Sequence, residues 1–222
     1  MNLTIYKYQG AGNDFVIIDN RNLTFPKEND NIIHKLCDRN FGIGADGLIL
    51  LENDTDTDFK MVYYNADGNE STMCGNGGRC IVAFAHQLGL FKTTTSFIAI
   101  DGVHYASIAD GIVALQMIDV ETIKVENDFV FVDTGSPHHV VIVENLSEYP
   151  VFEEGMRIRN NLYGKEGSNI NFVEKINDNT FRVRTYERGV AGETLACGTG
   201  VTAVAIAMHK TGATQSTSIT LP

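Results

Sequence analysis

Two stretches of the chain share one design: Cys74-Gly75-Asn76-Gly77-Gly78-Arg79-Cys80-Ile81-Val82-Ala83-Phe84-Ala85 and Cys197-Gly198-Thr199-Gly200-Val201-Thr202-Ala203-Val204-Ala205-Ile206-Ala207. In each stretch, a cysteine and a glycine-rich turn lead into an apolar run long enough for a buried helix. The first run predicts a helix over residues 75–90, ending near Gly89, and the second a helix over residues 198–209. We therefore expect two buried helices that each begin directly after a cysteine.

The same spacing relates other motifs of the two halves. Cys197 lies 123 residues after Cys74. A shift of 123 residues, without a gap, also lays Gly12-Asn13 on Gly135-Ser136 and Gly44-Ala45-Asp46 on Gly167-Ser168-Asn169. We interpret the chain as two pseudo-symmetric lobes, residues 1–120 and 121–222, which meet near residues 118–127.

The order of predicted strands and helices repeats as well. Alternating apolar patterns and turn signals predict strands at residues 3–8, 15–19, 47–51, 59–64, 96–100, 104–109, 112–117, 129–133, 140–144, 170–174, 180–186 and 216–221. Further helices are expected at residues 30–40, capped by Asp30, and at residues 153–161. Three strands follow the first apolar helix and about one follows the second, so we expect the second lobe to be incomplete at its C-terminal end.

Composition narrows the classes of function. The 222 residues carry a net charge of -11, which argues against nucleic-acid or anionic-membrane partners. No apolar run reaches the length of a membrane span and the N-terminus is typical of a strand, so we expect a cytoplasmic protein. The four cysteines form no CxxC pair, which disfavours a disulfide framework.

We also expect no cofactor and no metal. The sequence from Gly42 to Gly47 matches G-x-G-x-x-G, but a helix precedes it and a strand follows, the reverse of a dinucleotide site. His138-His139 has no partner at metal-ligand spacing.

The chemistry of the two cysteine motifs follows from their place at helix starts. Unpaired backbone N–H groups and the helix dipole favour a thiolate there, and the same groups can hold a carboxylate. Two such thiols suit the inversion of an α-carbon, in which one removes a proton from one face and the other delivers a proton to the opposite face. The alternative is that Cys74 and Cys197 are buried packing residues, as we expect for Cys37 and Cys80.

Two further positions call for a choice between roles. Glu187-Arg188-Gly189 ends a predicted strand at a place that mirrors Asn65, so we favour a site role over a solvated surface pair. Arg188 could clasp a carboxylate and Glu187 an ammonium group. His138 is either an ordinary histidine at a strand end or a neighbour that tunes a thiol.

These motifs together resemble the diaminopimelate epimerase family. The residues that carry the resemblance are Gly10-Ala11-Gly12-Asn13-Asp14-Phe15, Asn65-Ala66-Asp67-Gly68, Met73-Cys74-Gly75-Asn76-Gly77-Gly78-Arg79, Asn169-Ile170-Asn171-Phe172, Glu187-Arg188-Gly189 and Cys197-Gly198-Thr199-Gly200. The resemblance implies an α/β (α+β) fold of two similar lobes, each a curved, mostly antiparallel sheet around a central helix, with the site in the cleft between them. It also implies an isomerase that interconverts LL- and meso-diaminopimelate, without pyridoxal phosphate, on the route to lysine and peptidoglycan.

By residue, the resemblance makes Cys74 and Cys197 the acid and base. It implies that Gly75, Asn76, Gly198 and Thr199 hold the reacting carboxylate. It further implies that the remaining substrate groups bind to Asn13, Asn65, Ser136, Asn169, Glu187 and Arg188. His138 and Glu187 would then adjust the pKa values of the thiols. The chain departs from the family pattern at Gly47, where glutamine is frequent, and at Ser136, where asparagine is frequent.

Several alternatives stay open from sequence alone. A proline racemase-like enzyme of the same fold, a thiol redox protein and a non-catalytic amino-acid-binding protein each account for part of the pattern. The oligomeric state, with a homodimer as one option, and the assignment of each thiol to one epimer are not determined by the sequence.

Overall fold

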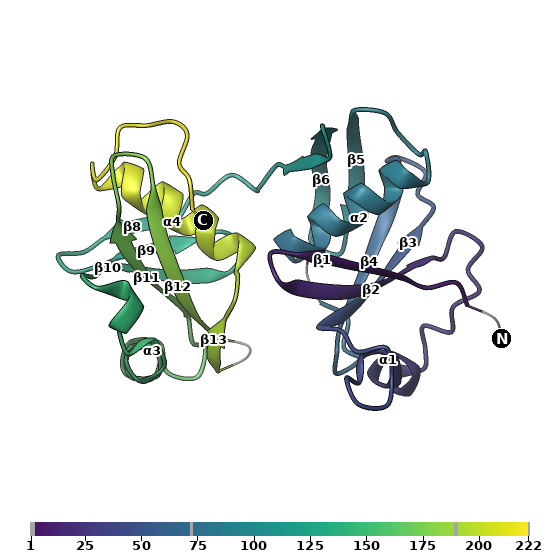
Figure 1. Ribbon diagram of the computed structural model, residues 1–222, viewed down its shortest axis with the longest axis horizontal. Helices are drawn as coiled ribbons and strands as arrows, with labels where there is room; N and C mark the ends of the chain where they lie inside the picture. Colours follow the sequence, from purple (N-terminus) through teal and green to yellow (C-terminus); the bar gives the residue numbers. More distant parts are fainter. Residues whose placement is uncertain (1–2, 72, 189–190, 222) are drawn as a thin grey trace. The chain divides into compact units, whose positions relative to one another are not determined.

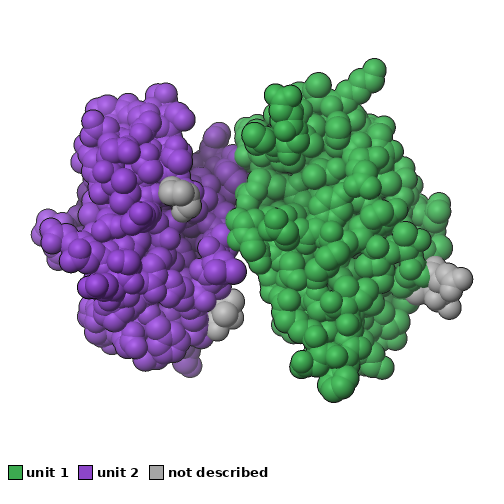
Figure 2. Space-filling view, viewed as in Figure 1, with its two compact units in different colours: residues 1–116 green, residues 117–222 purple. Residues whose placement is uncertain are grey.

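The computed structural model describes residues 3–71, 73–188 and 191–221, so Gly189 of the predicted Glu187-Arg188-Gly189 motif lies outside the described residues. The chain forms two compact units, Met1–Gln116 (unit 1) and Met117–Pro222 (unit 2), coloured separately in Figure 2. Each unit contains one curved mixed sheet and few helices (Figure 1). The fold is α+β, as the sequence predicts.

Unit 1 is a seven-stranded sheet in the order β1-β2-β3-β4-β5-β6-β7. The pairs β2–β3 and β4–β5 are parallel and the others antiparallel. Its elements are β1 (Tyr6–Gly10), β2 (Asn13–Asp19), α1 (Asp30–Cys37), β3 (Gly47–Glu52), β4 (Phe59–Asn65), α2 (Gly75–Gln87), β5 (Thr94–Ala99), β6 (Gly102–Ala109) and β7 (Ile112–Leu115).

The central strands β2, β3 and β4 of the unit 1 sheet are buried on both faces. Successive side chains of a strand point to opposite faces, so Phe15 and Ile17 of β2 pack in the core that contains α2, while Val16 and Ile18 pack in the core that contains α1. The whole of β3 is buried, as its unbroken apolar sequence indicates. In Figure 1, α2 and α1 accordingly lie on different sides of this sheet.

Unit 2 is a six-stranded sheet in the order β13-β12-β11-β10-β9-β8, in which only β10–β11 is parallel. Val132 and Val140 pack with α4, and Ile170 and Phe172 pack on the side of α3. Its elements are β8 (Ile123–Val125), β9 (Val130–Asp133), β10 (Pro137–Ile142), η1 (Leu146–Glu148), α3 (Val151–Ile158), η2 (Arg159–Tyr163), β11 (Asn169–Lys175), β12 (Phe181–Glu187), β13 (Gly192–Thr194) and α4 (Gly198–Lys210).

Three local predictions are wrong. Asp30 is the first residue of α1 and the N-cap is Asn29, without a side-chain capping hydrogen bond. The strand expected at residues 216–221 is reduced to one bridge between Thr180 and Thr220, because a turn in which Ser218 N donates to Ser216 Oγ (3.1 Å) takes the backbone out of the ladder. The three-residue strands β8 and β13 were not expected.

The internal repeat holds with one correction. Helices α2 and α4 are both 13 residues long and start 123 residues apart, at Gly75 and Gly198. Phe15 pairs with Gly47, however, and its counterpart His138 pairs with Asn169, so β3 and β11 are offset by 122 residues. The connection before β11 is one residue shorter than its counterpart, so Asn169 corresponds to Gly47 rather than to Asp46.

Candidate active site

Cys74 is the N-cap of α2 in unit 1, as predicted. Its backbone is extended, and its carbonyl accepts the first bond of the helix from Gly78 N at 2.7 Å. The side chain therefore lies beside the N–H groups of the first turn, which have no partner within the helix. A Cβ at Gly77 would lie 3.1 Å from Ile49 Cδ1, and one at Gly78 would lie 2.9 Å from Leu115 Cδ2. The glycines thus allow this helix start to pack directly on the core.

An asparagine oxygen faces the Cys74 sulfur. Asn13 donates from Nδ2 to Asp46 Oδ2 (2.6 Å), and Asn13 Oδ1 lies 3.7 Å from Cys74 Sγ. Arg39 donates to the other oxygen of Asp46 (2.7 Å) and holds that carboxylate in place. The amide of Asn13 is therefore oriented by Asp46, which the sequence did not single out.

The other predicted residues of unit 1 lie at the start of α2 and at the end of β4. Gly75 and Asn76 are buried in the first turn of α2, where Asn76 Oδ1 accepts a hydrogen bond from Arg79. Asn65 is the half-buried last residue of β4 and begins a turn in which Gly68 N donates to its carbonyl (3.0 Å).

Cys197 is the N-cap of α4 in unit 2, again as predicted. Its Sγ lies 3.5 Å from Thr199 Oγ1, and Thr199 Oγ1 lies 3.0 Å from His138 Nε2. His138 thus reaches the sulfur through the hydroxyl of Thr199, in the first turn of the helix. A Cβ at Gly200 would lie 3.2 Å from this sulfur, so the turn closes tightly around it.

The imidazole of His138 is fully buried on β10. Burial and the nearby charge of Arg188 lower the pKa of His138 to about 4. His138 is therefore neutral near pH 7 and can carry a hydrogen on one ring nitrogen only.

A second group of predicted residues is joined by Asn169. Its Nδ2 donates to Ser136 Oγ (3.0 Å) and its Oδ1 accepts from Arg188 N (2.8 Å). Ser136 thus keeps one hydrogen-bonding role at the position where the family often has asparagine. Glu187 accepts from Thr194 Oγ1 (2.6 Å) on β13, a partner that sequence analysis missed because β13 was taken for a loop.

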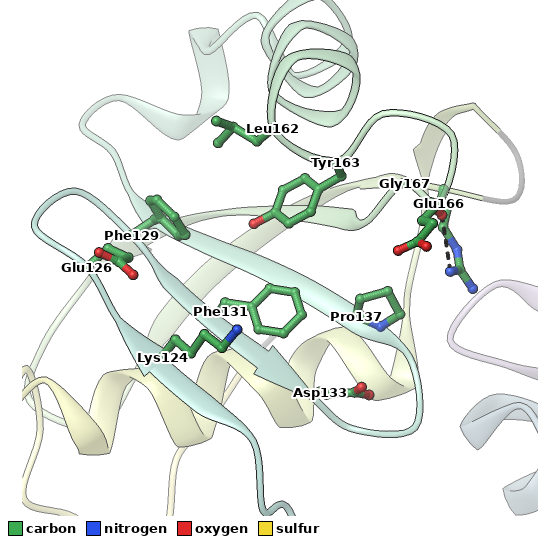
Figure 3. Close-up of a pocket in the computed structure, with 11 residues that line it drawn as sticks. Lys124, Glu126, Phe129, Phe131, Asp133, Pro137, Leu162, Tyr163, Glu166 and Gly167 are labelled. Atoms are coloured by element: carbon green, nitrogen blue, oxygen red, sulfur yellow. Dashed lines mark hydrogen bonds between the residues drawn. The ribbon is translucent and has the colours of Figure 1, made fainter.

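Arg188 also lines a pocket of about 780 Å³ in unit 2. Phe131 and Tyr163 form its aromatic wall, and Glu166 and Gly167 lie at the end near Pro137 (Figure 3). The Arg188 guanidinium makes a long hydrogen bond to the carbonyl of Glu166 (3.4 Å). Among the described residues, this is the one hydrogen bond that the guanidinium makes.

The other two cysteines have the structural role expected of them. Burial raises the pKa of Cys37 to about 11 and that of Cys80 to about 12, so both stay protonated and unreactive near pH 7. Within the described ranges, no group of three or more His, Cys, Asp or Glu side chains is arranged to hold a metal ion. No helix in those ranges is long and apolar enough to cross a membrane.

Solved structures with this fold include a PhzF-family phenazine biosynthesis protein from Bacillus anthracis (TM-score 0.72, 18% identity, 94% of this chain and 81% of that one). A hydroxyproline epimerase from Agrobacterium vitis also shares it (TM-score 0.62, 16% identity, 94% and 77%). The chain thus has the two-unit fold of this group of proteins.

Sequence similarity defines the family. The diaminopimelate epimerase family pattern matches residues 5–126 and 130–222. The diaminopimelate epimerase of Flavobacterium psychrophilum is 61% identical over 99% of this chain and 86% of its own length. That of Aquifex aeolicus is 40% identical over 95% and 82%. The chain belongs to the diaminopimelate epimerase family.

Proposed function

We propose that the chain is a diaminopimelate epimerase that interconverts LL- and meso-2,6-diaminopimelate by two-base proton transfer at the α-carbon. One observation carries the mechanism: each unit places a cysteine as the N-cap of a buried, glycine-started helix, at equivalent points of a repeated fold. Family membership supports the substrate.

The thiolate of one cysteine removes the α-proton, and the thiol of the other delivers its own proton to the opposite face. The electron pair of the broken C–H bond rests on the carbanion beside the carboxylate and then forms the new C–H bond. After one turnover, the two sulfurs have exchanged protonation states. N–H groups at the two helix starts stabilise the charge that develops on the carboxylate.

The remaining residues bind and tune. Gly75, Asn76, Gly198 and Thr199 contribute the helix starts that hold the reacting carboxylate. Asn13, Asn65, Ser136, Asn169, Glu187 and Arg188 bind the remaining substrate groups, and the second carboxylate of diaminopimelate suits the guanidinium of Arg188. His138 and Glu187 adjust the thiols, His138 through Thr199.

The alternatives have less support. A proline racemase-like enzyme shares the fold, but its ring substrate has no second amino-acid head to occupy Arg188. A thiol redox protein would leave two anion-binding helix starts without a role. We further propose that the reaction takes place in the cytoplasm without a cofactor, and we leave a homodimer as an open possibility.

Incubation of the purified protein with LL-diaminopimelate in heavy water tests the proposal. The expected result is formation of the meso form with deuterium at the inverted α-carbon. Proline and hydroxyproline serve as comparison substrates. If proline is inverted and diaminopimelate is not, the chain is a racemase of the alternative class. If the α-hydrogen of diaminopimelate does not exchange at all, an epimerase function is excluded.

A further inference from the structure

Asn171 lies in the core of unit 2, fully buried on β11, and its side chain contacts three groups. Its Nδ2 donates to the backbone oxygen of His139 (3.1 Å) and lies 3.2 Å from His138 Nδ1, while its Oδ1 accepts from Thr185 Oγ1 (3.0 Å). A carbonyl oxygen only accepts, so the contact with His139 fixes which end of the amide is nitrogen. Asn171 therefore presents a donor to His138 Nδ1.

This donor determines the tautomer of His138. A neutral imidazole has one hydrogen. Since Nδ1 accepts from Asn171, the hydrogen is on Nε2, which donates to Thr199 Oγ1 at 3.0 Å. The Thr199 oxygen is then an acceptor toward His138, which leaves its own hydrogen available for Cys197 Sγ, 3.5 Å away.

We infer that Asn171 is a positioning residue: it holds His138 in the Nε2–H tautomer, so that Thr199 donates to Cys197 and Cys197 is the thiolate of the resting enzyme. A hydroxyl donor stabilises the charged sulfur more than the protonated one. Arg188 is the charged side chain that acts on His138, and its charge also favours the neutral ring.

Unit 1 shows the opposite arrangement, which supports the assignment. Asn13 commits its Nδ2 to the Asp46 carboxylate, so an amide oxygen faces Cys74. An oxygen acceptor interacts with S–H and favours the thiol. Cys74 is then the acid of the resting enzyme. The assignment of the base to Cys197 and of the acid to Cys74 rests on the proposed function. The hydrogen-bond directions do not, because they are the same for any substrate.

The direct test is nitrogen NMR of the intact protein with labelled histidine, without substrate. The expected result is a neutral His138 with its hydrogen on Nε2 near pH 7. A hydrogen on Nδ1 of His138 in the wild-type protein would overturn the inference. Because no turnover is measured, this result is independent of whether the protein proves to be an epimerase.

One variant tests the link to the thiol. Asn171→Leu removes the donor to Nδ1 without adding charge. The measurement is the rate of alkylation of each cysteine by iodoacetamide against pH, resolved by mass spectrometry. In this variant the alkylation profile of Cys197 should move to higher pH by about one unit, a roughly tenfold slower reaction below its midpoint.

Cys74 is the internal control, since its profile should not move. Thr185→Val is the matched control for damage to the core, because it removes a partner of Asn171 but keeps both amide donors. It should lower stability and leave the His138 tautomer and the Cys197 profile in place. An unchanged Cys197 profile in Asn171→Leu, or an equal shift in Thr185→Val, would overturn the role of Asn171.

Discussion

Gly47 and Asn169 occupy the same position in the two sheets, since Gly47 pairs with Phe15 and Asn169 pairs with the counterpart of Phe15, His138. In unit 2, the Asn169 amide joins Ser136 to the backbone of Arg188. In unit 1, the same position has no side chain, and Asp46, one residue earlier, binds Asn13 instead. The repeat has diverged at the position where the family often has glutamine.

Gly47→Ala should destabilise unit 1. A Cβ at Gly47 would lie 2.6 Å from Tyr63 Cε2 and 2.6 Å from the backbone oxygen of Tyr64, and the strand cannot move its backbone easily. Overpacking of this kind costs about 1–3 kcal/mol of unfolding free energy. Urea denaturation measures the loss.

Gly89→Ala is the comparison for this variant. A Cβ at Gly89 meets nothing within 4 Å, so the cost there comes only from its positive φ of +73 and is about 1 kcal/mol. If Gly47→Ala loses no more stability than Gly89→Ala, the neighbours of Gly47 adapt and the close packing has little energetic weight.

Much of the fold was predictable because burial leaves a periodic pattern. The continuous apolar run of β3 and the apolar helices α2 and α4 were recognised from that pattern. The short strands β8 and β13 were missed, since three residues contain too little alternation to distinguish a strand from a loop.

The site was predictable only where a motif defines it. Both cysteines are helix N-caps as expected, because glycine-rich turns before apolar runs are a local signal. Asn171 and Asp46 lie within motifs recognised in the sequence, but no site role was predicted for them, since their importance comes from contacts with residues 33 positions away in each case. Such contacts depend on strand register, and the register shift of one residue between the units is not visible in an ungapped comparison.

Acid should destabilise the protein in a pH window set by two buried histidines. Burial lowers the pKa values of His138 and His139 to about 4 from the ordinary 6.5. Between these values the unfolded chain binds protons that the folded chain does not, so stability falls as the pH drops from 6.5 toward 4. The full loss is on the order of 3 kcal/mol for each histidine.

His139→Phe tests this pH range and leaves the side chains of His138, Thr199 and Cys197 unchanged. Urea midpoints at several pH values should fall less steeply between pH 6.5 and 4 in the variant than in the wild type. Asp14, whose pKa is held low by Arg39 and Lys7 against the effect of burial, weakens the fold only at still lower pH. Equal slopes for variant and wild type would mean that His139 is not neutral in the folded protein.

Arg188→Ala should weaken diaminopimelate binding by at least roughly 2 kcal/mol, the scale of a lost charge-assisted contact. The fold should tolerate the change, because the Arg188 backbone N–H still donates to Asn169. Steady-state kinetics give the effect on KM and kcat. Arg182→Ala is the matched control: this side chain is 61% exposed and lies 3.8 Å from Glu174. If the two variants behave alike, Arg188 is an ordinary surface residue.

Mild oxidation should inactivate the enzyme reversibly by joining Cys74 to Cys197. Two thiols that act on one carbon have to approach each other closely, whereas Cys37 and Cys80 are buried and have raised pKa values. Peptide mapping of the oxidised protein identifies the linked pair, and a reducing agent should restore activity. An inactive, oxidised protein with both thiols free would show that the two cysteines do not share a substrate.

Single-cysteine variants test the two-base mechanism itself. In heavy water, early product from either epimer should carry deuterium at the α-carbon while unreacted substrate stays mostly protonated, because each face has its own proton carrier. Cys74→Ala and Cys197→Ala should each abolish inversion, since one face loses its carrier. Cys37→Ala removes a thiol in the core of unit 1 and should retain inversion with some loss of stability.

The residual exchange of the two variants decides the assignment. The remaining thiol can still exchange the α-hydrogen of the epimer that presents its C–H bond to that side. Cys74→Ala and Cys197→Ala should therefore prefer opposite epimers, as followed by loss of the α-proton signal in NMR. A single shared base predicts instead that one variant keeps both activities and the other loses both. Inversion near the wild-type rate in either variant would exclude the two-base mechanism, because one sulfur would then suffice for both faces.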